Sequence, residues 1–342
     1  MRVLFDIVHP ADVLFFKRPM DVLLARGDEI LVLSRKKDVA CELLDGFGIP
    51  HYPISRAATG TVPLALELAR RDLAVWRAIR RFQPHVMIGF GGVAIAHAGR
   101  LTGVPALSVY DSENATLQTR ITWPFITHLY VPEAYGGPVP SGRTTRWPGT
   151  KELSFLHPTS FQPNRDIALS HGVAETGETF FLRVVDWRAN HDIGKAGWSG
   201  EMLQDVIRHL SARGRVILSS ERPLPEAFEA YRYRGPITDV HHVMGHCRMV
   251  LGESATMASE AAILGVPGLY AGRDFPGYLG DLARAGLLSE VRGGGTEAVL
   301  TAADAALSVP TEEIRNRRDA YVAQCPDWAE AVVEALAAHS AP

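Results

Sequence analysis

The stretch CRMVLGESATMASEAAILGVPGL, residues 247–269, carries the signals of a strand, a sharp turn and a helix in direct succession. The apolar residues 249–251 predict the end of a buried strand, and Gly252 permits a sharp turn. Ser254 is a favourable N-cap residue for a helix that Gly265 would end. The stretch therefore predicts one strand-turn-helix step of an α/β domain.

The start of this helix is a candidate phosphate site. The first N–H groups of a helix have no partners within the helix and carry the positive end of its dipole. Ser254, Ala255 and Thr256 are therefore expected to hold a diphosphate through backbone and hydroxyl donors. Glu260 follows Ser254 at a distance of about 9 Å along a helix axis, where a nucleotide would place its ribose. A capped helix with a solvated Glu260 explains the same residues.

Length and composition favour two domains and exclude several classes of protein. At 342 residues the chain is longer than a domain with one hydrophobic core usually is. The net charge of -3 gives no overall attraction to nucleic acid, and three widely separated cysteines suit a reducing compartment. No apolar run is long enough to span a membrane. We therefore expect a cytoplasmic protein without a nucleic-acid partner, with at most peripheral contact at the inner membrane face.

A local pattern that occurs twice indicates two similar halves. A strand, a glycine, a helix and the sequence Gly-Val-Pro follow one another around Gly89 and again around Gly252. Alternating strands and helices predict parallel sheets with right-handed crossovers. The predicted fold class is therefore α/β, with two Rossmann-like, doubly wound domains facing across a cleft.

A segment rich in proline, glycine, serine and threonine, residues 132–163, contains the expected domain boundary. We predict a first domain over residues 1–160, which would bind an acceptor, and a second over residues 161–310, which would bind a nucleotide. The helical segment 311–342 is expected to pack back on the first domain.

In the first half, polar residues and glycines follow predicted strands. His9 comes after the first strand, where open α/β sheets bind ligands, and a neutral imidazole there would serve as a general base. Asp111, Glu113 and Asn114 follow a later strand and would orient His9, transfer a proton or bind sugar hydroxyls. Gly91 lies in a turn that permits close approach of an acceptor. A loop histidine bonded to the backbone and a helix-capping Asp111 are the simpler explanations.

In the second half, the loop after the first strand supplies cations. Arg183 and Lys195 would complete a phosphate clamp opposite the helix that starts at Ser254. His191 and Asp192 suggest a metal ligand pair, but no further ligands accompany them. The sequence also lacks the D-x-D motif that holds manganese in many sugar-transferring enzymes. We therefore predict neither a metal nor a resident cofactor.

The predicted helix over residues 62–82 is both basic and apolar. It combines five arginines with Leu64, Leu66 and Trp76. Such a helix either rests on an anionic membrane surface or packs on its own domain with a solvated basic face. The second arrangement is the commoner one.

Motifs spread over nearly the whole chain resemble, in order, those of an archaeal and bacterial family of unknown function placed among GT-B-like proteins. These motifs are DIVHP at 6–10, GFG at 89–91, DSEN at 111–114, PGTKEL at 148–153, LHP at 156–158, HDIG at 191–194, SSE at 219–221 and GES at 252–254. More distantly, residues 113–115 and 254–267 resemble motifs of the peptidoglycan N-acetylglucosaminyltransferase and of non-hydrolysing UDP-N-acetylglucosamine 2-epimerases. The resemblance implies a GT-B fold and a nucleotide-sugar site.

In those relatives the glutamate matching Glu260 holds the ribose, residues matching 254–256 hold the diphosphate, and the histidine matching His9 lies near the reacting sugar. The glycine-rich first loop of the transferase is absent here, because proline follows His9, so the identity of the acceptor does not transfer. The matching motifs add further residues to the expected nucleotide-sugar site, namely His191, Ser220, Glu221 and Glu253.

The sequence thus predicts a metal-independent glycosyltransferase that takes a sugar from a nucleoside-diphosphate sugar, UDP-linked by resemblance, as co-substrate. Its acceptor would be a glycan, a lipid-linked molecule or a small molecule. His9 would be the base, while Arg183, Lys195 and the Ser254 cap would stabilise the departing diphosphate. The alternatives are a nucleotide-sugar epimerase or hydrolase, and a non-catalytic binding protein.

Overall fold

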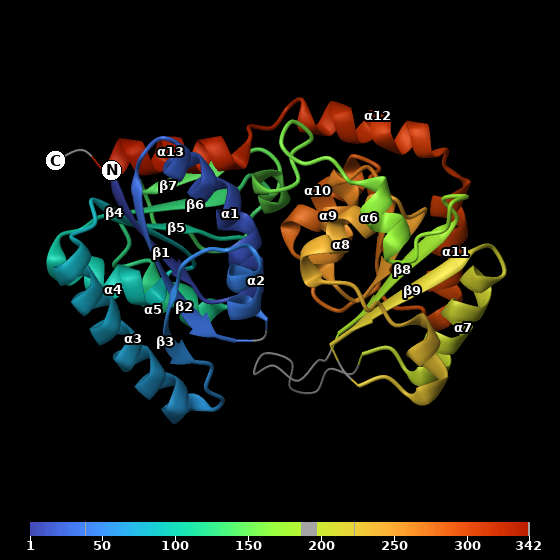
Figure 1. Ribbon diagram of the computed structural model, residues 1–342, viewed down its shortest axis with the longest axis horizontal. Coiled ribbons are helices and arrows are strands. Elements are labelled where there is room, and N and C mark those ends of the chain that lie inside the picture. The colour runs from blue at the N-terminus through green and yellow to red at the C-terminus, as the bar shows by residue number, and fades with distance from the viewer. Residues whose placement is uncertain (38, 186–196, 222, 341–342) are drawn as a thin grey trace. The chain divides into compact units, whose positions relative to one another are not determined.

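The computed structural model describes residues 1–342 apart from residue 38, residues 186–196, residue 222 and residues 341–342. It divides into two compact units, which Figure 1 shows in ribbon form. Unit 1 comprises Met1–Phe155 and Cys325–Pro342, and unit 2 comprises Leu156–Gln324. The division thus falls slightly before the boundary predicted at residue 160.

The described residues of unit 1 form a seven-stranded parallel sheet in the order β3-β2-β1-β4-β5-β6-β7. The central strand, Val86–Phe90, is buried over its first four residues, which explains its continuous apolar sequence VMIGF. The strands are β1 (Arg2–Ile7), β2 (Glu29–Lys36), β3 (Tyr52–Arg56), β4 (Val86–Phe90), β5 (Ala106–Val109), β6 (His128–Pro132) and β7 (Thr144–Trp147).

Helices cover both faces of this sheet, as Figure 1 shows. On one face α1 (Pro10–Ala25) packs against α2 (Ala40–Gly46) and α13 (Trp328–His339). On the other, α3 (Thr61–Phe82) packs against α4 (Val93–Thr102), which contacts α5 (Thr116–Thr122). A short 3-10 helix, η1 (Lys151–Ser154), contacts α1 and α13. Unit 1 is therefore a three-layer, doubly wound structure.

Unit 2 repeats this architecture on a five-stranded parallel sheet with the order β12-β11-β10-β8-β9 in the described residues. The strands are β8 (Thr179–Val184), β9 (Arg215–Ser220), β10 (Met249–Gly252), β11 (Gly268–Tyr270) and β12 (Leu288–Glu290). The helices are α6 (Arg165–Ser170), α7 (Gly200–Ser211), η2 (Glu226–Tyr231), η3 (Ile237–Asp239), α8 (Val240–Met244), α9 (Ala255–Ile263), α10 (Gly277–Arg284), α11 (Gly295–Ser308) and α12 (Thr311–Val322). The predicted α/β class with two Rossmann-like units is confirmed.

The C-terminal segment 311–342 differs from its prediction, because its two helices belong to different units. On α12, Arg317 donates to the carbonyl of Gly286 at 3.0 Å, and Arg318 donates to that of Ile263 at 3.1 Å. These bonds hold α12 on unit 2, while α13 packs on α1 of unit 1. None of the helices within the described ranges is long and apolar enough to span a membrane.

A histidine connects the three helices on one face of unit 1. The Nδ1 atom of His97 on α4 lies 2.9 Å from Asp72 Oδ2 on α3, and its Nε2 atom lies 2.9 Å from the carbonyl oxygen of Ile121 on α5. The hydrogen bond with Asp72 raises the pKa of His97 above its ordinary value of 6.5. A charged His97 is therefore favoured in the folded state.

This raised pKa predicts a pH-dependent contribution to stability. The stabilisation from the His97–Asp72 pair should be fully present below pH 6.5 and should be lost as the pH rises through the raised pKa of the folded state. We therefore expect Asp72→Asn to lower the free energy of unfolding more at pH 6 than at pH 9, as measured by urea denaturation. An equal loss at both values would show that the pair does not titrate in this way.

Candidate functional site

Each sheet has one place where the strand order reverses, and the predicted site residues gather at these two places. In unit 1 the reversal lies between β1 and β4, and in unit 2 between β8 and β10. Open α/β sheets bind ligands beyond the carboxyl ends of their strands at such a point. His9 and Gly91 directly follow β1 and β4, while Arg183 and Ser254 lie at the ends of β8 and β10.

In unit 2 the start of α9 has the predicted form. Ser254 is its N-cap residue in an extended conformation, and its hydroxyl accepts a hydrogen bond from the Met257 N–H at 3.3 Å. Gly252 before it has a φ of +144°, and a Cβ atom there would lie 2.0 Å from the carbonyl oxygen of Arg183. Only glycine therefore allows the end of β10 to lie so close to β8. The predicted turn and cap are confirmed.

Arg183 extends from the end of β8 toward the neighbouring strand β9. Its Nη1 atom donates to Ser219 Oγ at 2.7 Å, and its Nη2 atom forms an ion pair with Glu221. Ser220 ends β9 between these two partners. Arg183 and Glu221, both predicted for the nucleotide-sugar site, are thus paired, and Ser220 precedes Glu221 in the chain. A guanidinium binds phosphate and carboxylate by the same geometry, so a diphosphate at Arg183 would compete with Glu221.

Glu253 forms hydrogen bonds within the protein. It is buried, and its two carboxylate oxygens accept backbone hydrogen bonds from Val185 at 3.3 Å and from Trp198 at 2.8 Å. The carboxylate therefore fastens residues 185 and 198 to the end of β10, and a positioning role fits it better than contact with a ligand. The predicted residues His191 and Lys195 lie outside the described residues.

Glu260 lies in the interior of unit 2. The residue is 3% exposed, and its Oε1 atom lies 3.3 Å from Nε2 of His241 on α8, which is also buried. The interpretation of Glu260 as a solvated residue is therefore wrong. Its assignment to a ribose stays a prediction, to which the structure adds His241 as a neighbour. The sequence offered no local sign of this pair, because His241 stands among three histidines and its contact with α9 is tertiary.

His9 begins α1 and belongs to a capping box. Its Nδ1 atom accepts the Ala11 N–H at 3.2 Å, while Asp12 Oδ2 accepts the N–H groups of Val8 and His9, each at 2.9 Å. Although His9 keeps contact with solvent, desolvation of its ring lowers the pKa of His9, and the nearby cations of Lys37 and two further basic residues lower it more. The ring is therefore neutral at pH 7.

The cap also selects the tautomer of this neutral ring. Because Nδ1 accepts a hydrogen bond, the proton of the neutral imidazole resides on Nε2. His9 thus presents a hydrogen-bond donor beyond the end of β1. The predicted role as a general base requires the bond from Ala11 to break first, whereas a role as a donor to the sugar or to a developing negative charge needs no rearrangement.

Asp111 follows β5 and forms a buried ion pair that the predicted site residues did not include. Its Oδ2 atom lies 2.5 Å from Lys151 Nζ, and its Oδ1 atom accepts the Ser112 hydroxyl at 3.0 Å. The helix that follows is capped by Ala115 without a side-chain hydrogen bond, so the interpretation of Asp111 as a helix cap is wrong. Lys151 belongs to the motif PGTKEL, which was the one signal in the sequence that pointed to it.

The other predicted residues of unit 1 lie on the same edge of its sheet. Glu113 Oε1 accepts the Gly136 N–H at 3.3 Å, and Asn114 beside it is exposed. Gly91 has a φ of +77°, and a Cβ atom there would lie 2.1 Å from Gln118 Nε2. The backbone conformation therefore favours glycine at this turn, while the side chain of Gln118 could move aside for a Cβ atom.

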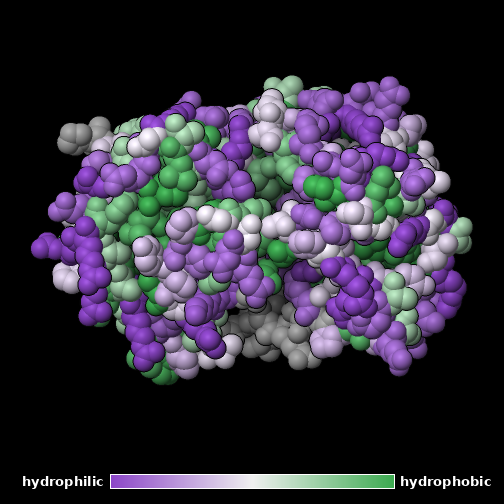
Figure 2. Space-filling view, viewed as in Figure 1, coloured by the Kyte–Doolittle hydropathy of each residue, from purple (hydrophilic) through white to green (hydrophobic). Residues whose placement is uncertain are grey.

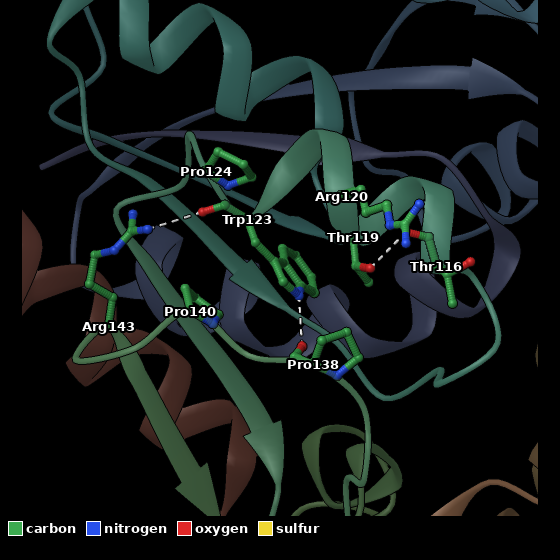
Figure 3. Close-up of a pocket in the computed structure, with 8 residues that line it drawn as sticks. All are labelled: Thr116, Thr119, Arg120, Trp123, Pro124, Pro138, Pro140 and Arg143. Carbon is green, nitrogen blue, oxygen red and sulfur yellow. Dashed lines mark hydrogen bonds between the residues drawn. The ribbon is translucent and has the colours of Figure 1, made fainter.

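A cavity of about 480 Å³ opens in unit 1 just beyond this loop, as Figure 3 shows. Among its lining residues, the indole N–H of Trp123 donates to the carbonyl of Pro138 at 2.8 Å, and Arg143 donates to the Trp123 carbonyl at 3.2 Å. Its volume falls within the range of small-molecule sites. The lining residues are Thr116, Thr119, Arg120, Trp123, Pro124, Pro138, Pro140 and Arg143.

Fold and strand-end sites together define a protein with two Rossmann-like units, each carrying polar groups at its point of strand reversal. The chain belongs to DUF354, a family of proteins of unknown function, whose model matches residues 1–277. The predicted family resemblance is thereby confirmed. Comparison with curated protein sequences gave no match. Among the described residues, no group of three or more histidine, cysteine, aspartate or glutamate residues is placed to hold a metal ion.

Solved structures of similar fold cover almost the whole chain. The UDP-GlcNAc 2-epimerase from Neisseria meningitidis bound to UDP-GlcNAc matches with a TM-score of 0.68 and 12% identity, over 98% of this chain and 100% of that one. The UDP-N-acetylglucosamine 2-epimerase from Rickettsia bellii matches with a TM-score of 0.68 and 14% identity, over 99% and 97%. A spinosyn rhamnosyltransferase matches with a TM-score of 0.65 and 14% identity, over 98% and 99%. The chain therefore has the GT-B type of fold.

Proposed function

We propose that this protein acts on a nucleoside-diphosphate sugar and that it is a metal-independent glycosyltransferase. The observation that carries the proposal is the arrangement at the strand reversal of unit 2. There the capped start of α9 follows β10, and Arg183 lies at the end of the neighbouring strand β8, with its guanidinium bonded to Ser219. Backbone N–H groups at a helix start and a guanidinium at the next strand end are both groups that bind phosphate.

The same donors would stabilise the leaving group. When the glycosidic bond to the nucleotide breaks, negative charge grows on the β-phosphate, and fixed donors at α9 and Arg183 stabilise that charge without reorganising. Glu260 would accept the ribose hydroxyls, with His241 beside its carboxylate. The choice of UDP rests on the resemblance of residues 254–267 and on the UDP-linked ligands of proteins with the same fold.

Unit 1 would receive the acceptor. His9 offers its Nε2–H group after β1, and Asp111 after β5 forms a buried ion pair with Lys151 of η1. Glu113 and Asn114 would bind hydroxyl groups of the acceptor. The cavity beyond this loop would accommodate a further part of a glycan, of a lipid-linked acceptor or of a small molecule.

An epimerase or hydrolase is the second candidate, and the cap of His9 favours it. With Nδ1 occupied and Nε2 protonated, the ring has no free lone pair to remove a proton from an acceptor hydroxyl. A carboxylate would then have to act as acid or base, which is the chemistry expected of Asp111 or Glu113 in an epimerase. Solved epimerases of this fold are as similar to the chain as the transferase is.

A thermal-shift panel of nucleotides and nucleotide sugars tests the proposal. A ligand that binds only the folded protein stabilises it by about 2.7 kcal/mol when its concentration is a hundred times its dissociation constant. We expect nucleoside diphosphates and their sugars to raise the melting temperature, and Glu260→Gln to reduce the increase. A panel in which no nucleoside diphosphate has an effect would contradict the proposal.

Incubation of the stabilising nucleotide sugar with the protein then separates the candidate functions. Turnover that requires an added acceptor identifies a transferase. Conversion of the sugar, or release of the nucleotide, without any acceptor identifies an epimerase or hydrolase. Unchanged ligand despite tight binding identifies a non-catalytic nucleotide-sugar-binding protein.

A further inference from the structure

Helix α3 of unit 1 exposes an apolar stripe to solvent. Val62, Leu66, Leu73 and Trp76 are between 41% and 69% exposed. At 100° per residue these four positions and Ala69 fall within an arc of about 80° on the helix surface. The face of α3 that packs on unit 1 lies opposite, at Arg71, Val75 and Ile79. The stripe is therefore additional to the packing face rather than part of it.

The exposed charged residues beside this stripe are all basic. The exposed charged side chains of α3 are Arg70, Arg77, Arg80 and Arg81. Its two acidic residues are engaged with other elements: Glu67 is buried against Arg35, with bonds of 2.6 and 2.7 Å, and Asp72 bonds His97. The outward surface of α3 thus combines apolar side chains with arginines that form no ion pair with the described residues, in a chain whose net charge is -3.

The adjoining helices α4 and α5 also combine exposed apolar side chains with exposed arginines. Neither α4 nor α5 contains an acidic residue. Leu101 on α4 and Leu117 on α5 are among the most exposed large apolar side chains of the described residues, and Arg100 and Arg120 beside them are exposed as well. Figure 2 shows hydrophobic and hydrophilic side chains mixed over the region where Figure 1 places α3.

We propose that this outward face of α3, continued by α4 and α5, docks on an anionic phospholipid bilayer. Leucine, valine and tryptophan on one stripe would enter the boundary between headgroups and acyl chains, and the arginines would bind the phosphate groups. A second copy of the chain fits the face poorly, because a symmetric contact would bring the arginines of both copies together. Nucleic acid fits poorly as well, because binding to phosphates leaves no partner for the exposed apolar stripe.

Docking of this kind does not require the nucleotide-sugar site proposed above, because it involves neither point of strand reversal, although Arg120 of α5 also lines the cavity of unit 1. It would hold the protein at the membrane surface without any spanning segment. A single amphipathic face gives reversible binding that depends on lipid charge and on salt.

Sedimentation with lipid vesicles tests the proposal on the full-length protein. We expect the protein to sediment with vesicles that contain phosphatidylglycerol, to remain in solution with pure phosphatidylcholine, and to be released by high salt. Arg77→Glu with Arg80→Glu should weaken binding to the anionic vesicles by at least about tenfold. Leu73→Ser with Trp76→Ser should weaken it by at least about tenfold through loss of the apolar contact.

Matched changes elsewhere control for net charge and exposed apolar area. Arg208 and Arg234 of unit 2 have side chains that are 69% and 70% exposed, so Arg208→Glu with Arg234→Glu makes the same charge change away from the face. Ile237→Ser removes an exposed apolar side chain of unit 2. Both controls should bind anionic vesicles like the unchanged protein. All variants should keep the melting temperature of the unchanged protein, because the altered side chains are exposed.

Three results would overturn the proposal. The first is equal sedimentation of the face variants and the unit 2 controls, and the second is failure of the unchanged protein to bind anionic vesicles at low salt. The third is a dimer in sedimentation velocity that Leu73→Ser with Trp76→Ser dissociates, which would identify the face as an interface between copies of the chain.

Discussion

Replacement of Lys151 by methionine is expected to lower the free energy of unfolding by about 3–5 kcal/mol. Lys151 and Asp111 are both buried and lie 2.5 Å apart, so the substitution would leave a carboxylate in the protein interior without its cation. An uncompensated buried charge is far more costly than the loss of a surface ion pair, which amounts to about 1 kcal/mol or less. Urea denaturation of the unchanged protein and of Lys151→Met measures the difference.

A second substitution separates the charge effect from a packing effect. Lys151 Nζ also lies 3.6 Å from Oε1 of the buried Glu152, so Lys151→Met with Asp111→Leu removes one of the two carboxylates that lose this cation. The double variant should therefore recover part of the lost stability. Lys17→Met serves as the control, since Lys17 pairs with Asp21 on the exposed surface of α1 and its loss should be nearly neutral. A loss of less than about 1 kcal/mol for Lys151→Met would contradict the buried ion pair.

Replacement of His9 by asparagine should reduce turnover by about 10²–10³-fold, the usual cost of losing a fixed donor to developing charge, while leaving nucleotide binding and folding intact. Asparagine is among the best N-cap residues, so it can keep the start of α1 in place while removing the imidazole. His9→Ala removes the cap as well and should cost about 1 kcal/mol of stability in addition. Steady-state kinetics with the nucleotide sugar identified by thermal shift, together with melting temperatures of both variants, measure these effects.

The lowered pKa of His9 also predicts how turnover depends on pH. Because the ring is neutral at pH 7 and its pKa lies below the ordinary value of 6.5, turnover should not fall with a midpoint near pH 6.5 on acidification. A midpoint at that pH would show that His9 titrates like a solvated histidine. Full activity of His9→Asn would remove His9 from the reaction altogether.

The local features of this fold could be predicted from short stretches of sequence. The turn at Gly252 and the cap at Ser254 depend on backbone conformation and on one side chain that bonds a nearby N–H group, so residue type and spacing indicate both. The alternation of strands and helices likewise indicated two doubly wound units. The positions of His9 and Arg183 at strand reversals then follow from the order of the strands.

The contacts that define the chemical state of the site could not be predicted in this way. Asp111 meets Lys151 across 40 positions of sequence, and His241 meets Glu260 through the packing of α8 on α9. The tautomer of His9 depends on a bond to the Ala11 N–H that only the start of α1 creates. The allocation of α12 to unit 2 depends on arginines that reach backbone carbonyls distant in sequence.

Titration of UDP by isothermal calorimetry, against the unchanged protein and three variants, tests the central claim most directly. Arg183→Met removes a charged donor and should weaken binding by about tenfold or more, while Ser254→Gly removes the hydroxyl but costs the helix only a few tenths of a kcal/mol. Arg208→Met removes an exposed arginine elsewhere in unit 2 and should leave binding unchanged. Weaker binding of UDP by both site variants, with normal binding by the control, is the predicted result. Binding that all three variants keep unchanged would contradict a diphosphate site at the start of α9.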